Sequence, residues 1–422
     1  MKRYEHYKDS GIAWLPQVPA HWEIAHLRKY LSLVSVKGMG DKQLLSVTRE
    51  KGVIERNVED QEENHNFVPD DLSGYKYVQP GQFVINKMKS WQGSYGVSDY
   101  EGIVSPAYYV CDLDFPFKPF FSMAIRSRSY VDFFAQWSKG IRVGQWDLEP
   151  IALKSIPFFE PPVDEQKKIV EYLDKQITLI ESRKCQRERE LQTLNELKQA
   201  EIASVVTRGL NPNVPMKDSG QVQFGEIPAH WDSVKMKYCF IQRSEKGFPD
   251  EPVLCATQSR GVIPQSLYEN RVVVVNKGFE GLKLVKVGDF VISLRSFQGG
   301  IEYAYYQGII SAAYTILTPK DERCSSYFKY LFKSHPFIQL LQTCVTGIRE
   351  GQNINYGMLG NNFIPIPPIE EQQEIVSYIE SKTCKIDKMI ESLTAEIERL
   401  SEYKQRLISD VVTGQINVQD SI

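Results

Sequence analysis

Two short segments combine cations, amides and hydroxyls in a pattern that suits contact with nucleic acid. Each follows an apolar, strand-like run: Asn86-Lys87-Met88-Lys89-Ser90-Trp91-Gln92-Gly93 and Ser293-Leu294-Arg295-Ser296-Phe297-Gln298-Gly299. Lysine and arginine bind phosphates, while Arg, Gln and Ser can hydrogen-bond to base edges in the major groove. The candidate binding residues here are Lys87, Lys89, Ser90, Gln92, Arg295, Ser296 and Gln298. A solvated turn above a buried Trp91 or Phe297 is an equally good interpretation.

A second pair of segments places an arginine and a glutamine among glycines. They read Lys139-Gly140-Ile141-Arg142-Val143-Gly144-Gln145 and Thr346-Gly347-Ile348-Arg349-Glu350-Gly351-Gln352. Glycine lets a backbone approach a phosphate closely, although it also shapes ordinary turns before a strand. We favour binding, because these matched side chains have no evident role in a core. The candidates are Arg142, Gln145, Arg349 and Gln352.

Motifs for catalysis are missing from the sequence. It contains no Asn-Pro-Pro-Tyr or Asp-Pro-Pro-Tyr, the signature for methylating an exocyclic amine, and no glycine-rich cofactor loop or Walker lysine motif. No HExxH or paired His/Cys ligand set is present. His21 and His230, each beside a tryptophan, are interpreted as packing and hydrogen-bonding residues. The sequence therefore predicts no catalytic, cofactor-binding or metal site.

The candidate segments occur twice because the whole chain is a repeat. Lys8-Asp9-Ser10-Gly11 recurs as Lys217-Asp218-Ser219-Gly220, and Pro19-Ala20-His21-Trp22 recurs as Pro228-Ala229-His230-Trp231. Further matches continue to the end of the chain in the same order and at nearly the same spacing, which predicts a duplicated architecture. Residues 55–77 and 264–284 barely match. The framework is therefore duplicated, while part of the surface differs.

Each repeat begins with a block of mixed structure, residues 24–160 and 233–366. Short runs rich in Val, Ile, Phe and Tyr, separated by Gly and Pro, predict strands. The predicted strands include Leu44–Thr48, Gln82–Asn86, Ile103–Val110, Ile156–Phe159, Val253–Thr257, Phe290–Leu294 and Ile309–Leu317. Helices are predicted at Phe120–Trp137 and Ser325–Gln342.

Each block is followed by a long tail without glycine or proline. The tails run from Val163 to Val206 and from Ile369 to Thr413, directly after Pro161-Pro162 and Pro367-Pro368. Apolar residues spaced by three, four and seven predict coiled-coil helices about 65 Å long. The polar middle of the first tail indicates a wet centre or one covered by another protein. A self-contained coiled coil is the simpler interpretation, but the repeat favours a spacer between two blocks.

The bulk composition limits the class of protein. A chain of 422 residues with 42% apolar residues is expected to form two or three domains. Its net charge of −3 argues against a simple basic nucleic-acid binder, although a clamp can concentrate cations on one face. No apolar run is long enough for a membrane span. Seven scattered cysteines indicate reduced thiols, so we expect a cytoplasmic protein.

Taken together, these motifs resemble the DNA-specificity subunits of type I restriction-modification systems. The resemblance rests on two Pro-x-His-Trp motifs, two diverged blocks, and two junctions of the form Pro-Pro-x-x-Glu-Gln-x-x-Ile that open the long helices. The junctions lie at Pro161–Ile169 and Pro367–Ile375. The resemblance covers nearly the whole chain.

The resemblance implies an α+β fold with a pseudo-two-fold repeat. Its parts would be a first target recognition domain (1–162), a spacer helix (163–208), a second recognition domain (209–368), and a second helix with a tail (369–422). Each recognition domain would read half of an asymmetric DNA site. The antiparallel helices would set the spacing and dock two modification subunits.

The resemblance also implies that the chain itself is not an enzyme and binds no cofactor. S-adenosylmethionine, ATP and Mg²⁺ would belong to the modification and restriction/translocase subunits that act on double-stranded DNA. Two alternatives remain open: a coiled-coil interaction protein, and a fused DNA methyltransferase or nuclease with an unrecognised site.

Overall fold

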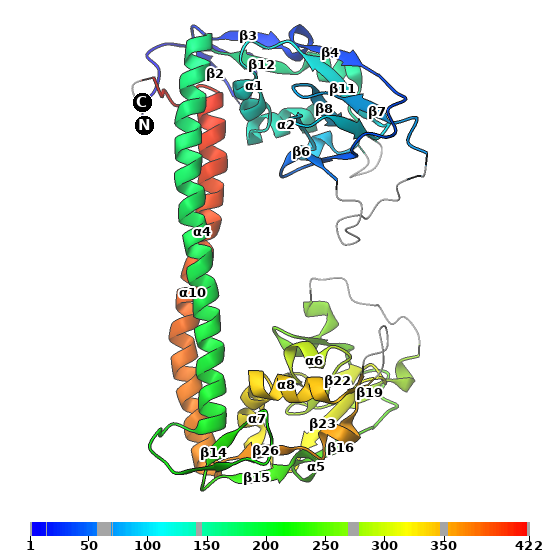
Figure 1. The fold of residues 1–422 in the computed structure, drawn as a ribbon, viewed down its shortest axis with the longest axis vertical. Helices are drawn as coiled ribbons and strands as arrows, with labels where there is room; N and C mark the ends of the chain where they lie inside the picture. The colour runs from blue at the N-terminus through cyan, green and yellow to red at the C-terminus, as the bar shows by residue number, and fades with distance from the viewer. Residues whose placement is uncertain are drawn as a thin grey trace. The chain divides into compact units, whose positions relative to one another are not determined.

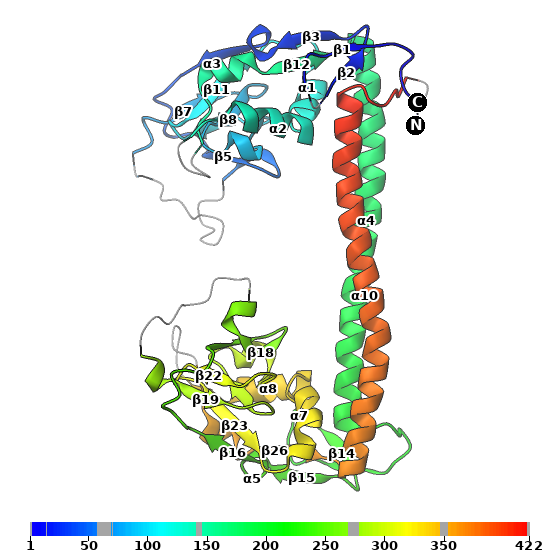
Figure 2. The same ribbon diagram turned by 180° about the vertical axis from the view of Figure 1, so that it is seen from behind.

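The chain divides into two compact units (Figures 1 and 2). Unit 1 comprises Met1–Arg187 with Ala395–Ile422, and unit 2 comprises Glu188–Thr394. The computed structural model describes residues 2–13, 15–56, 69, 71–140, 146–268, 278–346 and 353–419.

Unit 1 is built on a four-stranded antiparallel sheet in the order β4-β11-β8-β9. These strands are Leu31–Val34, Tyr108–Leu113, Phe83–Asn86 and Tyr95–Val97. Successive side chains point to opposite faces of a strand. Phe83 and Ile85 therefore pack in one core with the helices, whereas Val84 packs in a separate valine-rich core. The sheet is thus covered on both faces.

Helices cover one face of this sheet and paired strands cover the other. The helices are α1 (Lys118–Ile125), α2 (Arg128–Trp137) and α3 (Pro150–Ser155). The strand pairs are β5 (Leu45–Thr48) with β6 (Gly52–Glu55), and β7 (Lys76–Val78) with β10 (Gly102–Val104). Val47, Val78 and Val104 from these pairs bury their side chains against Val84 and Val110 of the sheet. Figures 1 and 2 show α1 and α2 on the side of the sheet that faces the long helices.

Unit 2 repeats this plan. Its sheet has the order β16-β23-β20-β21, formed by Phe240–Arg243, Thr315–Pro319, Phe290–Ile292 and Glu302–Tyr303. Its strand pairs are β17 (Leu254–Thr257) with β18 (Gly261–Pro264), and β19 (Lys283–Val285) with β22 (Gly308–Ile310). Its helices are α6 (Ser296–Gly299), α7 (Ser325–Leu331) and α8 (His335–Thr343). The order matches unit 1, which confirms the duplicated α+β framework.

Smaller elements join each sheet to the long helices. In unit 1 they are β1 (Tyr7–Asp9), β2 (Gln17–Pro19), β3 (Glu23–His26) and β12 (Pro157–Glu160). In unit 2 they are β13 (Met216–Asp218), β14 (Glu226–Pro228), β15 (Asp232–Lys235), α5 (Met236–Cys239), β24 (Val345–Thr346), β25 (Asn353–Ile354), α9 (Tyr356–Leu359) and β26 (Phe363–Ile366). Strand β12 pairs with β3, and β26 pairs with β15, so the end of each block lies beside its beginning.

Two kinds of predicted element are divided in the structure. The predicted helices break at Ser127 and Ser334, whose extended backbones begin α2 and α8. The predicted strands Ile103–Val110 and Ile309–Leu317 break at turns closed by Tyr108 N–H to the Ser105 carbonyl and by Tyr314 N–H to the Ser311 carbonyl. In both cases continuous apolar composition hides a local turn.

The two long helices contribute to both units. Helix α4 spans Val163–Arg208 (46 residues), and α10 spans Ile369–Val412 (44 residues). In unit 1, Glu181 of α4 bonds Lys404 of α10 at 2.5 Å, and Arg183 bonds Glu396 at 3.2 Å. In unit 2, Lys198 bonds Asp387 at 2.5 Å. Residue numbers rise along α4 as they fall along α10, so the helices are antiparallel within each unit, as predicted.

The apolar contacts of these helices are concentrated near their ends. Ile169 and Leu173 pack with Leu407 and Val411 in unit 1, and Val205 and Val206 pack with Ile375 in unit 2. No side chain is buried between residues 181 and 201 or between 380 and 406, segments that the structure describes completely. The middle of each helix is therefore only partly covered within its unit, and both interpretations of the first helix, a wet centre or one covered by another protein, stay predictions.

Candidate nucleic-acid interface

The Pro-Pro-x-x-Glu-Gln junction of unit 1 is a buried hydrogen-bond network. The Glu165 carboxylate, whose side chain is 5% exposed, accepts from the Tyr4 hydroxyl at 2.5 Å and the Trp22 indole N–H at 3.1 Å. Its second oxygen lies 2.7 Å from His21 Nε2. Burial and the hydrogen bond to Glu165 raise the pKa of Tyr4, so this hydroxyl stays protonated. The junction therefore fixes the N-terminal segment to the start of α4.

Unit 2 contains the same network with one donor fewer. Glu371 lies 2.7 Å from His230 Nε2 and accepts from the Trp231 indole N–H at 2.9 Å. Each junction glutamine also donates to a proline carbonyl at 2.8 Å, from Gln166 to Pro161 and from Gln372 to Pro367. Both histidines thus have the framework role predicted from the sequence.

Each network begins one long helix and also contacts the residue that follows the end of the second long helix. Gly414, which follows α10, lies against Pro19 and Trp22 in unit 1, and Gly209, which follows α4, lies against Trp231 in unit 2. Both glycines have φ near +74°, and a Cβ at Gly414 would collide with Pro19. Each sheet is therefore positioned by the start of one long helix and the end of the other.

The β8 loop (Lys87–Gln92) separates its candidate side chains into supporting and exposed groups. Ser90 is completely buried and donates to the Lys87 carbonyl at 3.1 Å. Lys87 pairs with Asp147 at 2.9 Å, which raises its pKa. Lys89 is exposed, and its side chain makes no hydrogen bond or ion pair within the described part of the chain, while Gln92 is half-buried. Lys89 is therefore the freest group for a ligand in this loop.

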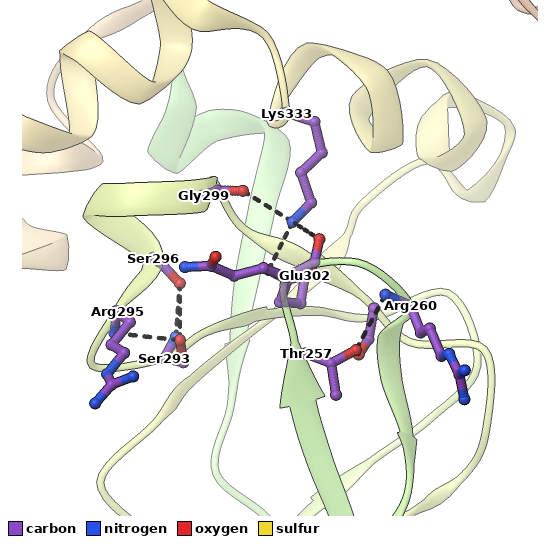
Figure 3. Close-up of polar contacts among 10 residues, drawn as sticks. Thr257, Arg260, Ser293, Arg295, Ser296, Gly299, Glu302 and Lys333 are labelled. Atoms are coloured by element: carbon purple, nitrogen blue, oxygen red, sulfur yellow. Dashed lines mark hydrogen bonds and ion pairs between the residues drawn. The ribbon is translucent and has the colours of Figure 1, made fainter. Parts of the chain in front are cut away.

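The β20 loop (Ser293–Gln298) has the same organisation in unit 2. Ser296 is 2% exposed, and its hydroxyl accepts from the Ser293 N–H at 2.8 Å. Arg295 and Gln298 are exposed. Figure 3 shows Arg295 extending away from the Ser293–Ser296 contact. Ser90 and Ser296 thus support the loops that carry Lys89 and Arg295.

Arg142, Gln145, Arg349 and Gln352 lie outside the described residues, so their contacts stay predictions. Their flanks are described as paired backbone. Lys139 and Asp147 exchange two backbone hydrogen bonds in unit 1, and β24 pairs with β25 in unit 2. The β8 loop of unit 1 contacts one of these flanks. Lys87 forms an ion pair with Asp147, and Trp91 packs on Trp146 with ring centroids 5.1 Å apart.

Two cations that sequence reasoning missed fasten further turns beside these loops. Arg126 donates to the Tyr95 carbonyl at 2.6 Å and to the Arg49 and Glu50 carbonyls at 2.9 and 2.7 Å. Lys333 donates to the Gly299 carbonyl at 2.9 Å and to the Glu302 carboxylate at 2.6 Å (Figure 3). The sequence did offer a signal for these residues. Arg126 and Lys333 are cations within apolar, helix-like segments and occupy the same position in both repeats.

Comparison with known proteins supports the resemblance on which the sequence interpretation rests. The family model described as the type I restriction modification DNA specificity domain matches residues 229–399. A Methanocaldococcus jannaschii chain assigned to the type I restriction enzyme MjaX as its specificity subunit is 23% identical, covering 98% of this chain and 97% of that relative. Residues 229–399 thus match a type I restriction modification DNA specificity domain, and the chain is similar to specificity subunits over nearly its whole length.

Further similar proteins agree with this chain in sequence or in fold. The type I restriction enzyme EcoBI specificity subunit of Escherichia coli is 24% identical, covering 61% of this chain and 58% of the relative. A chain in a solved structure of a type I R-M system is 16% identical and aligns with a TM-score of 0.64, covering 94% of this chain and 99% of that chain. That structure supports the fold: two mixed domains and two long helices.

No group of three or more His, Cys, Asp or Glu residues in the described segments is arranged to hold a metal ion. No helix within the same segments combines the length and the apolar character that crossing a membrane requires.

The Lys333–Glu302 contact is expected to make the stability of unit 2 depend on pH. Burial raises the pKa of Glu302 from 4.5 to about 7, although Lys333 lowers it. Between about pH 4.5 and 7 the folded unit therefore holds a proton that the unfolded chain releases. Its free energy of unfolding should fall as pH rises through this window, by about 3 kcal/mol in all.

Hydrogen exchange of unit 2 amides across this pH range measures the effect. Glu302→Gln should flatten the pH dependence between pH 4.5 and 7, because the titrating group is gone. Lys333→Met should move the fall to higher pH, because the cation that favours the carboxylate is lost. An unchanged profile in Glu302→Gln would contradict the assignment.

Proposed function

We propose that this chain is a type I restriction-modification specificity subunit, which reads double-stranded DNA through two recognition domains, residues 1–162 and 209–368. Each domain recognises one half of an asymmetric bipartite site. The observation that carries the proposal is the duplicated loop tip, where Lys89 and Arg295 occupy the same position of the repeat, exposed above a buried serine. Gln92, Gln298 and the predicted Arg142, Gln145, Arg349 and Gln352 complete the surface. Framework residues match between the repeats, whereas residues 55–77 and 264–284 differ. These differing segments let the two domains recognise different DNA sequences.

The first long helix (163–208) and the second long helix with its tail (369–422) set the spacing of the half-sites and dock two modification subunits. Supporting this role, the helix centres bury no side chain, and Leu179, Leu197 and Met389 are more than half exposed. Apolar side chains on an otherwise polar helix suit an interface with another protein. Restriction/translocase subunits join the same complex.

The chemistry belongs to the partner subunits. The modification subunits bind S-adenosylmethionine, and the restriction/translocase subunits use ATP and Mg²⁺. This chain binds no cofactor and has no catalytic residue of its own. Its contribution to the reaction, which takes place in the cytoplasm, is to select the sequence on which the partners act.

Removing the cations at the loop tips tests the proposal. Lys89→Ala and Arg295→Ala should each lower the slope of log affinity against log salt by about 0.9, because each removes one phosphate contact. The measurement is fluorescence anisotropy of a labelled duplex with the complete specificity subunit, assembled with its modification subunits, over a salt series.

Lys286→Ala is the matched control. Lys286 is also exposed, but it precedes β20, so it lies at the opposite end of that strand from Arg295. It should leave the slope unchanged. Equal slopes for all three variants and the wild type would contradict DNA binding by the loop tips.

A further inference from the structure

Two hairpin turns beside the candidate loops share one geometry. They are the β5–β6 turn (Thr48–Gly52) and the β17–β18 turn (Thr257–Gly261). Thr48 Oγ1 accepts from the Lys51 N–H at 3.1 Å, and Thr257 Oγ1 accepts from the Arg260 N–H at 3.1 Å. Gly52 and Gly261 close the turns with φ of 72° and 73°, a conformation that favours glycine. Each turn therefore holds a cation, Lys51 or Arg260, in a defined position.

Side-chain hydrogen bonds hold each turn against its loop. Arg126 joins the Arg49 and Glu50 carbonyls of one turn to the Tyr95 carbonyl of β9, which directly follows the β8 loop. Lys333 joins the Gln258 carbonyl of the other turn, at 3.3 Å, to the Gly299 carbonyl beside the β20 loop. A Cβ at Gly299 would lie 2.9 Å from the Gln258 side chain. Turn and loop therefore form one edge in each unit.

Each edge presents two exposed cations. Lys51 and Lys89 occupy the edge of unit 1, and Arg260 and Arg295 occupy the edge of unit 2. Arg260 makes a 3.3 Å hydrogen bond to the Leu267 carbonyl. Figure 3 shows Arg260 and Arg295 both extending away from Lys333. The half-buried cation, Arg126 or Lys333, thus bonds groups of the protein, while the outer pair remains accessible.

A positive charge occurs in both repeats at the position of Lys51 and Arg260, but not at the neighbouring position of Arg49 and Gln258. Arg49 is exposed but bonds Glu50 at 2.8 Å, so this neighbouring pair adds no net positive charge. Arg49 and Gln258 hold the same position in the two repeats, whereas Lys51 and Arg260 are both cations. An interaction common to both repeats, such as binding a phosphate, requires the charge, while the neighbouring position is free to differ.

We propose that each hairpin turn is a second DNA-contacting element, in which Lys51 and Arg260 bind backbone phosphates next to those bound by Lys89 and Arg295. The inference rests on the proposed DNA-reading function and adds a contact to it. Fixing two phosphates from two rigid segments orients the loop over the base edges.

The test compares the double variant Lys51→Ala/Arg260→Ala with Lys89→Ala/Arg295→Ala and Lys286→Ala. Each is the full chain assembled with its modification subunits and titrated with a labelled duplex over a salt series. We expect both double variants to lower the salt slope by about 1.8, since each removes two phosphate contacts, and Lys286→Ala to leave it unchanged. Lys51→Arg/Arg260→Lys should restore the wild-type slope, because it keeps both charges.

The outcomes separate the two proposals. If the loop variant lowers the slope and the turn variant does not, the turn inference is overturned and DNA reading stands. If the assembled wild type binds no duplex, both are overturned. Circular dichroism of the turn variant distinguishes lost contact from lost folding, and a wild-type spectrum with a lowered slope supports the inference.

Discussion

Replacing Glu165 by leucine should lower the free energy of unfolding of unit 1 by about 3–5 kcal/mol. The substitution removes a buried acceptor and leaves the Tyr4 hydroxyl, the Trp22 indole and His21 without their partner. Glu165→Gln keeps an acceptor of similar shape and should cost less. Because the chain has two units, hydrogen exchange resolved by mass spectrometry is the suitable measurement, reporting each unit separately.

Glu371→Leu provides an internal comparison. Glu371 accepts from two groups instead of three, and its side chain is 22% exposed compared with 5% for Glu165. The loss in unit 2 should therefore be smaller, about 1–3 kcal/mol. Equal losses in the two units would contradict the dependence on burial and donor number. A loss below about 1 kcal/mol in unit 1 would show that its network does not stabilise the junction.

Removing one heptad from each long helix should shorten the gap between the DNA half-sites by about 10 Å, or about three base pairs. The ion pairs identify segments that can be removed together, residues 188–194 and 388–394. The Arg187–Glu396 and Lys198–Asp387 pairs lie on either side and are retained. A heptad preserves the apolar repeat and the facing direction of each helix. Methylation of the original site should be lost and should reappear at the shortened site.

Methylation of a library of duplexes with varied gaps measures the change, using the complex assembled with modification subunits. The control deletes 188–194 alone, which shifts the helix register and should give no new preferred gap. Without modification subunits, no variant should transfer a methyl group. An unchanged gap in the double deletion would exclude the helices as the spacer, and transfer by the chain alone would show that it is an enzyme.

The long helices could be predicted because their signals are local. Pro161-Pro162 and Pro367-Pro368 cannot lie within a helix, and Gly209 and Gly414 adopt the left-handed conformation that follows one. The structure accordingly begins the helices at Val163 and Ile369. The breaks at Ser127 and Ser334 were missed, because apolar periodicity continues through them. The adjacent cations, Arg126 and Lys333, bond groups that lie far away in the sequence, including carbonyls of the hairpin turns, and these contacts cannot be seen in local periodicity.

For the candidate DNA-binding loops, the sequence predicted which residue types are present but not which side chains are exposed. Lysine, arginine and serine in one loop indicate a polar surface, but a sequence does not reveal which of them is buried. Ser90 and Ser296 support the loops from within, whereas Lys89 and Arg295 are exposed. The β5–β6 and β17–β18 turns were missed as candidates, because their position beside the loops depends on tertiary contacts. The division into recognition domains stays a proposal, since the compact units cut through both helices.

The end of α10 packs in unit 1, and the end of α4 packs in unit 2. This arrangement determines which unit can complete its core first during synthesis. Unit 2 is one continuous stretch of chain, so its core can close once α10 has begun to emerge from the ribosome. The core of unit 1 includes Leu407, Val411 and Val412, and these are made long after Trp22, Ile169 and Leu173. The apolar face of unit 1 that these residues cover therefore stays exposed to water while unit 2 is translated. It is the part of the nascent chain most prone to aggregation.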